Sequence, residues 1–117
     1  MPRSQLEITT SSVIRLVKEE ASYHRELQQQ TERLTKLEND QSNEDENKEY
    51  VLKQERLALE ETKKVMPTLK KKLAETVAAL GTLITEEGQK GSESNVEQIT
   101  AAKEAIAQAK TAEREVS

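Results

Sequence analysis

The stretch LEETKKVMPTLKKKLAETVAALGTL, residues 59–83, decides the fold of this 117-residue chain. Its apolar and threonine positions recur in alternating steps of three and four residues: Leu59, Thr62, Met66, Leu69, Leu73, Thr76, Leu80 and Leu83. Such steps make a heptad seam, the pattern with which one helix packs against another. They predict a long helix over residues 48–86. Because Pro67 removes one backbone hydrogen bond from it, we expect this helix to bend there.

A second apolar stripe at helical spacing lies upstream and predicts a helix over residues 12–39. Its members are Val13, Leu16, Val17, Ala21, Tyr23, Leu27, Leu34 and Leu37, with Glu20 and Gln30 as polar interruptions. Ser11 or Ser12 can cap its start, so residues 1–11 are expected to form a polar N-terminal lead. The segment DQSNEDEN, residues 40–47, has no apolar residue and predicts a turn.

The segment EEGQKGSESN, residues 86–95, predicts a second loop, and a third helix follows over residues 94–115. Ser94 and Glu97 have the spacing of a capping box at its start. The apolar stripe of this helix is rich in alanine, so it should bury little area. Three helices joined by short loops predict an all-α, up-down-up antiparallel three-helix bundle with left-handed, coiled-coil-like packing. We expect one domain over residues 12–117, with the second helix the longest.

Composition narrows the classes of function. The chain has 18 Lys+Arg against 22 Asp+Glu, a net charge of −4, one His and no Cys. Large aliphatic residues are few enough to raise the alternative of disorder, which the heptad pattern decides against. Without cysteines, a second histidine or a glycine-rich phosphate loop, we expect no enzyme, metal or cofactor, and we expect His24 to be a packed or half-exposed helix residue. The absence of a long apolar run predicts no membrane span, and we expect a cytosolic protein.

One charged run allows two interpretations. Five lysines between residues 63 and 72 have no acidic residue among them: Lys63, Lys64, Lys70, Lys71 and Lys72. The simple interpretation is a solvated helix face, and the functional one is contact with an acidic protein partner. Nucleic acid is disfavoured because no aromatic or arginine residues are interleaved and the chain as a whole is acidic.

Two blocks of sequence resemble the tubulin-binding cofactor A family of tubulin-specific chaperones. The first is Arg15-Leu16-Val17-Lys18-Glu19, followed by Tyr23, Glu26 and Gln29-Gln30. The second is Met66-Pro67, followed by Lys71-Lys72 and Leu73. The spacing between the blocks also agrees apart from small loop differences, and the resemblance covers roughly residues 8–87. The third helix matches only in its length and polarity.

The resemblance implies a three-helix bundle that captures quasi-native β-tubulin after its release from the cytosolic chaperonin, on the route to the α/β-tubulin heterodimer. It implies a cytoplasmic, cytoskeleton-associated protein with no catalysis, nucleotide or small-molecule substrate. We expect the contact residues on the exposed side of the first two helices: Arg15, Lys18, Glu19, Glu26, Gln29, Lys63 and Lys71. Tyr23, Pro67 and Leu73 are expected to be structural. The alternative is a generic helical scaffold or adaptor, and both a monomer and a homodimer remain open.

Overall fold

The computed structural model describes residues 2–40 and 46–116, without the side chains of residues 46 and 116. These residues form three α-helices: α1 (Gln5–Asn39), α2 (Glu46–Gly88) and α3 (Val96–Val116). A short 3₁₀ helix, η1 (Gly91–Glu93), precedes α3. The described residues contain no strand, so the predicted all-helical class and three helices are confirmed. Most of the turn predicted at residues 40–47 lies outside the described residues.

The longest helix is α2, with 43 residues against 35 in α1 and 21 in α3. It runs through Pro67 without an interruption of helical structure. Most of its heptad seam is buried as predicted: Leu59, Thr62, Met66, Leu69, Leu73 and Leu80. Thr76 and Leu83 are half-buried. The bend at Pro67 and the up-down-up, left-handed packing stay predictions.

The start of α1 corrects the sequence analysis. The predicted polar lead over residues 1–11 is wrong from Gln5 onward, because the helix begins there rather than at residue 12. A capping box starts it: the Glu7 N–H donates to Ser4 Oγ (3.1 Å), and the Ser4 N–H donates to Glu7 Oε1 (3.2 Å). These bonds satisfy amides that the first turn of a helix leaves without partners. The Ser12 hydroxyl instead donates to the Ile8 carbonyl (3.1 Å) inside the helix.

The chain divides into two compact units, each containing part of α1 and part of α2. The first unit comprises Met1–Ala21 and Leu69–Ser117, and the second comprises Ser22–Thr68. The single domain expected over residues 12–117 stays a prediction.

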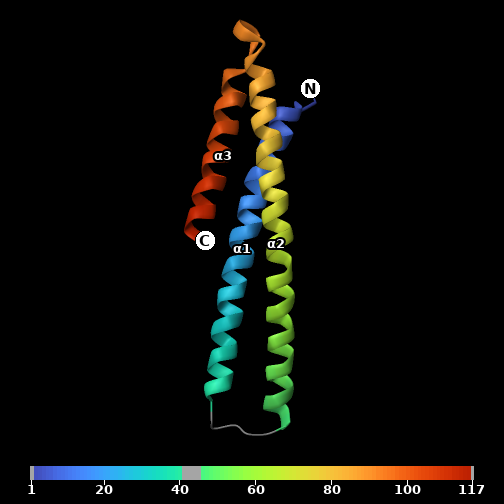
Figure 1. Cartoon of the computed structure of the whole chain (residues 1–117), viewed down its shortest axis with the longest axis vertical. Helices are drawn as coiled ribbons and strands as arrows, with labels where there is room; N and C mark the ends of the chain where they lie inside the picture. Colours follow the sequence, from blue (N-terminus) through green and yellow to red (C-terminus); the bar gives the residue numbers. More distant parts are fainter. Residues whose placement is uncertain (1, 41–45, 117) are drawn as a thin grey trace. The chain divides into compact units, whose positions relative to one another are not determined.

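The first unit contains parts of all three helices, including the whole of α3 (Figure 1). Leucines and a valine from α1 and α2 fill its core together with alanines from α3: Leu6, Val13, Leu16, Leu69, Leu73, Leu80, Ala102, Ala105 and Ala109. A hydrogen bond from the Ser4 hydroxyl to Gln98 Oε1 (2.9 Å) joins the start of α1 to the start of α3. Because α3 contributes mainly methyl groups, its burial adds little apolar stabilisation.

The second unit contains parts of α1 and α2 only. Its buried apolar side chains are Leu59 and Met66, while Tyr23, Leu27 and Leu52 are half-buried. Two long ion pairs connect the helices: Arg33 Nε lies 3.9 Å from Glu55 Oε2, and Arg56 Nη2 lies 3.9 Å from Glu38 Oε1. Solvent-exposed pairs of this kind each contribute about 0.5 kcal/mol.

The connection between α2 and α3 is a closely bonded turn. Gly91 has a φ of 64°, which glycine adopts without a steric penalty. The predicted capping box at Ser94 is wrong, because the Ser94 hydroxyl donates to the Gly91 carbonyl (2.7 Å). The cap of α3 is Asn95, whose Oδ1 accepts from the Gln98 N–H (3.0 Å). The 3₁₀ turn moves the helix start from residue 94 to Val96.

Glu87 holds this turn from the last residues of α2. Its Oε2 accepts from the Asn95 N–H (2.9 Å), and its Oε1 accepts from Lys90 Nζ (3.0 Å). The backbone hydrogen bond from Asn95, and then the Lys90 side chain, lower the pKa of the Glu87 carboxyl below its ordinary value. Both interactions stabilise the ionised form, so they hold the turn more strongly when Glu87 is ionised.

Candidate partner-binding surface

All seven residues predicted to contact a partner are exposed. Arg15, Lys18, Glu19 and Lys71 belong to the first unit. Arg15 and Glu19 are one helical turn apart, and Arg15 Nε lies 3.7 Å from Glu19 Oε1. Since this pair is well exposed, it contributes little to folding and its groups remain accessible to a partner.

In the second unit, the predicted residues lie on two different sides. Arg33 and Glu38 are five residues apart, so they are separated by about 140° around α1. Their ion pairs with α2 therefore mark opposite edges of the contact between the helices.

Glu26 and Gln29 lie on the Arg33 side of α1, being seven and four residues before Arg33. Lys63 lies seven residues after Arg56 on α2, and so on the Glu38–Arg56 side. Lys63 Nζ also lies 3.7 Å from Glu60 Oε1. The structure therefore does not bring Glu26, Gln29 and Lys63 onto one face of this unit.

The residues expected to be structural have different environments. Leu73 is fully buried in the core of the first unit. Tyr23 is half-buried on α1, and Pro67 is exposed on α2. Exposure places the proline ring on the outer side of the helix, away from the seam formed by Met66 and Leu69.

We use the name lysine cluster for Lys70, Lys71 and Lys72, which lie in the first unit. All three side chains are exposed. Within the part of the chain that the structure describes, none of them forms an ion pair. Glu75 is the nearest acidic residue along the helix, and it is exposed as well. The lysine cluster thus presents positive charge that no contact neutralises.

Two polar side chains are buried in the seam of α1, where the sequence analysis read them only as interruptions. Glu20, in the first unit, is 2% exposed, and Gln30, in the second, is 5% exposed. Among the described residues, Glu20 Oε2 and Gln30 Oε1 have no hydrogen-bond partner. Leu6, Val13 and Glu20 are seven residues apart and therefore occupy the same heptad position. This spacing is the sequence signal that would have predicted the burial of Glu20. Ala21, predicted in the stripe, is exposed.

His24 belongs to the second unit and is half-buried, as expected for a packed helix residue. Its Nε2 atom is buried and has no hydrogen-bond partner among the described residues. No group of three His, Cys, Asp or Glu residues in the described ranges is placed to hold a metal ion. No described helix is both long and apolar enough to cross a membrane.

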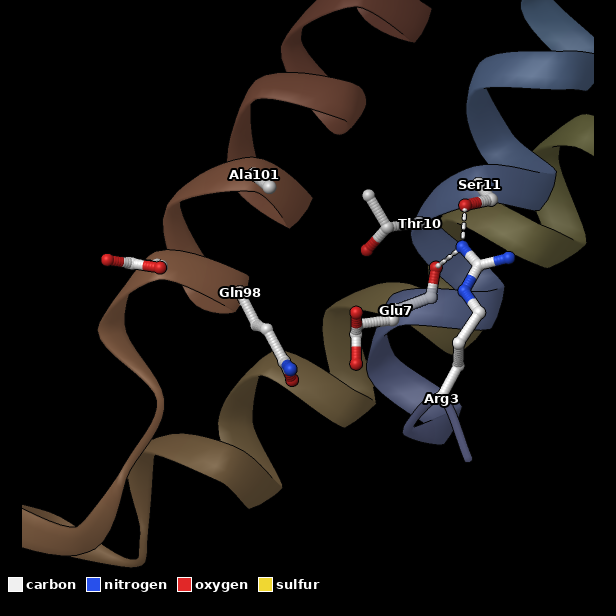
Figure 2. Close-up of a pocket in the computed structure, with 7 residues that line it drawn as sticks. Arg3, Glu7, Thr10, Ser11, Gln98 and Ala101 are labelled. Atoms are coloured by element: carbon white, nitrogen blue, oxygen red, sulfur yellow. Dashed lines mark hydrogen bonds between the residues drawn. The ribbon is translucent and has the colours of Figure 1, made fainter. Parts of the chain in front are cut away.

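A cleft of about 250 Å³ lies in the first unit between the N-terminal turns of α1 and α3. Figure 2 shows Arg3, Glu7 and Ser11 on the α1 side of the cleft, with Gln98 and Ala101 on the α3 side. The Arg3 guanidinium donates to the Glu7 carbonyl (3.5 Å) and to the Ser11 hydroxyl.

These bonds hold the side chain of Arg3, which precedes α1, against the first turns of that helix. The cleft lies where the starts of α1 and α3 meet. The predicted polar lead over residues 1–11 did not anticipate it.

The features described so far define a class: a small all-helical protein whose accessible chemistry lies on charged helical faces. Comparison with known sequences makes this more specific. The profile of the tubulin binding cofactor A family matches residues 1–106, and the chain belongs to that family.

One relative is tubulin-specific chaperone A from Saccharomyces cerevisiae, 37% identical over 75 residues, which cover 64% of this chain and 67% of the relative. No solved structure matches the chain significantly. The family resemblance proposed from the two sequence blocks is confirmed.

Proposed function

We propose that this protein is a tubulin-folding chaperone that captures quasi-native β-tubulin after its release from the cytosolic chaperonin and passes it towards assembly with α-tubulin. The observation that carries the proposal is the family match, which extends over α1, α2 and half of α3. The named yeast relative supports the same role. On this proposal the protein works in the cytoplasm, in association with the cytoskeleton, and carries out no catalysis.

The physical basis is shielding of a client surface by a folded helical face. Such a chaperone needs accessible polar and charged side chains that make many modest contacts, so that the client can be released again. The exposed residues of α1 and α2 supply them, including the Arg15–Glu19 pair and Lys71. We propose Arg15, Lys18, Glu19 and Lys71 as contacts from the first unit. Glu26 and Gln29, or Lys63 on the other edge, would contribute from the second.

The decisive experiment offers the purified protein newly folded α-tubulin and β-tubulin separately and separates the products on a native gel. A stable complex with β-tubulin and none with α-tubulin is the expected result. Binding of neither tubulin would contradict the proposal. Equal binding of both would contradict its β-tubulin specificity.

The second candidate function is a helical scaffold that self-associates, and one observation favours it. Tyr50 is 63% exposed and Leu57 is 50% exposed on the same side of α2, in the second unit. Exposed large apolar side chains on one helix face are suited to a helical partner. Sedimentation velocity over a range of concentrations, combined with a tubulin pull-down, distinguishes the two functions, because a scaffold would form dimers and would not bind β-tubulin.

A further inference from the structure

The lysine cluster is the most concentrated unbalanced charge on the described surface. Between Thr62 and Ala74 the chain has five lysines and no acidic residue, although its net charge is −4. Lysines elsewhere do form ion pairs, as Lys63 does with Glu60 and Lys90 does with Glu87. Positive charge concentrated on one stretch of a helix, with no balancing contact among the described residues, is available to an acidic partner.

Packing fixes where these charges point. Leu69 and Leu73 are buried, and they hold one side of α2 against the core of the first unit. Successive residues advance by about 100° around a helix, so the cluster spans about 200° of the remaining surface. Lys71 therefore points away from the core, and Lys70 and Lys72 flank it.

The surface of α2 that follows the cluster carries several short side chains. Ala74, Ala78 and Ala79 follow it on α2 and are all exposed, with the exposed Glu75 among them. The alanine side chains are short, so a peptide can lie close to the helix while its charged groups reach the lysines.

We infer that the lysine cluster is a docking point for an acidic peptide segment. The inference rests on the proposed function only in assigning that segment to the tubulin client. Lysine presents a compact charge on a flexible stem and suits carboxylates in varied positions, whereas arginine favours fixed bidentate geometry. No aromatic side chain accompanies the cluster to stack on bases. Carboxylates are therefore favoured over nucleic acid. Binding is electrostatic, so it weakens as salt rises.

The test is a titration of the full-length protein with a fluorescent poly-glutamate peptide at low and at physiological salt. The variant carries Lys70→Gln, Lys71→Gln and Lys72→Gln, because glutamine removes the charge and is a good helix former. Three lost charge contacts should weaken binding about tenfold, equivalent to about 1.4 kcal/mol.

A matched control removes the same amount of charge elsewhere. Lys36, Lys53 and Lys103 are exposed and form no ion pair among the described residues. Their triple glutamine variant should bind the peptide within about twofold of the unmodified protein, if local charge rather than net charge determines affinity. Far-UV circular dichroism verifies that both variants remain helical.

Several results would overturn the inference. These are no peptide binding by the unmodified protein, equal binding by the cluster variant, or equal weakening in the control. Tighter binding of a poly-uridine RNA than of the peptide would also overturn the choice of partner.

A parallel measurement of β-tubulin capture distinguishes a failure of this inference from a failure of the proposed function. If the unmodified protein captures no β-tubulin, the proposed function fails while the peptide titration still decides the docking point. If β-tubulin is captured and poly-glutamate does not compete, the assignment of the acidic segment to the client fails.

Discussion

Replacing Glu20 with leucine should make the protein more stable. Glu20 is 2% exposed in the core of the first unit, where Val13 and Leu16 are fully buried on the same helix, and its Oε2 has no partner among the described residues. A buried polar group without a hydrogen bond costs about 1–3 kcal/mol, and more when it is charged. Leucine has a similar size and should gain about 1.5 kcal/mol or more from burial.

The gain is reduced because a branched side chain does not fit a site shaped by an unbranched one, at a cost of about 1 kcal/mol. We therefore expect Glu20→Leu to raise the free energy of unfolding by about 2 kcal/mol. For a chain of this length that corresponds to a rise in Tm of about 8 °C. Glu20→Gln removes the charge and keeps an unpaired oxygen, so it should give about half of this gain.

The assay is urea unfolding followed by far-UV circular dichroism, with thermal unfolding as a second measurement. Glu32→Leu is the control, because Glu32 is exposed on the same helix and forms no ion pair among the described residues. It should change stability by less than about 0.5 kcal/mol. An unchanged or lower midpoint for Glu20→Leu, with a neutral control, would refute the reasoning, since the carboxylate would then have a stabilising partner in solution.

Other parts of the fold give further predictions. Gly81 lies inside α2 with open space around it, so Gly81→Ala should stabilise the protein by about 0.5–1 kcal/mol in urea unfolding. Gly91 also has open space but a φ of 64°, so Gly91→Ala should destabilise by about 1 kcal/mol, and equal effects at both glycines would contradict the role of backbone conformation. Asn95→Ala should cost about 1 kcal/mol through loss of the α3 cap, measured in the same way, whereas Ser94→Ala should cost less. The lowered pKa of Glu87 stabilises the fold above the ordinary carboxyl pKa, and this contribution is lost as the pH falls through the lowered value. Glu87→Gln should therefore lower Tm at neutral pH, with a difference from the unmodified protein that shrinks on acidification; a difference independent of pH would exclude the ionised form as its source.

Periodicity predicts most of the burial in α2, because a heptad pattern states directly which side chains face a neighbouring helix. Leu73 and Leu80 are fully buried as that pattern requires. The same reasoning fails at Glu20 and Gln30, where a heptad position is occupied by a polar residue. Burial there depends on the neighbouring helix covering the position, which hydrophobicity alone does not reveal.

Short polar contacts were the other source of error. Ser4 and Glu7 have the spacing of a capping box, but residues 1–11 were assigned to a polar lead before the first helix. At the start of α3, Ser94 was predicted as the cap, but with the 3₁₀ turn at Gly91 the cap is Asn95. Local hydrogen bonds of this kind depend on backbone angles that neighbouring segments impose.

For the candidate surface, all seven residues predicted to contact a partner lie at exposed positions, and their role as contacts stays a prediction. It did not predict that Lys63 lies on the edge of the second unit marked by Arg56, with Glu26 on the other edge. The side of a helix that a residue occupies follows from its heptad position. The orientation of the second helix determines which of its residues lie beside a given edge of the first helix.

The alanine face of α3 has a consequence for how that helix is held in register. Ala102, Ala105 and Ala109 present nearly the same shallow surface at successive turns, so a slip of one turn, about 5.4 Å, would bring alanine against almost the same neighbours. Apolar packing alone distinguishes poorly between these positions. The bond from Ser4 to Gln98 aligns the start of α1 with the start of α3, and the bond from the Asn95 N–H to Glu87 fixes the start of α3 to the end of α2. In this part of the protein, polar contacts at one end of the helix select a register that the apolar core leaves undecided.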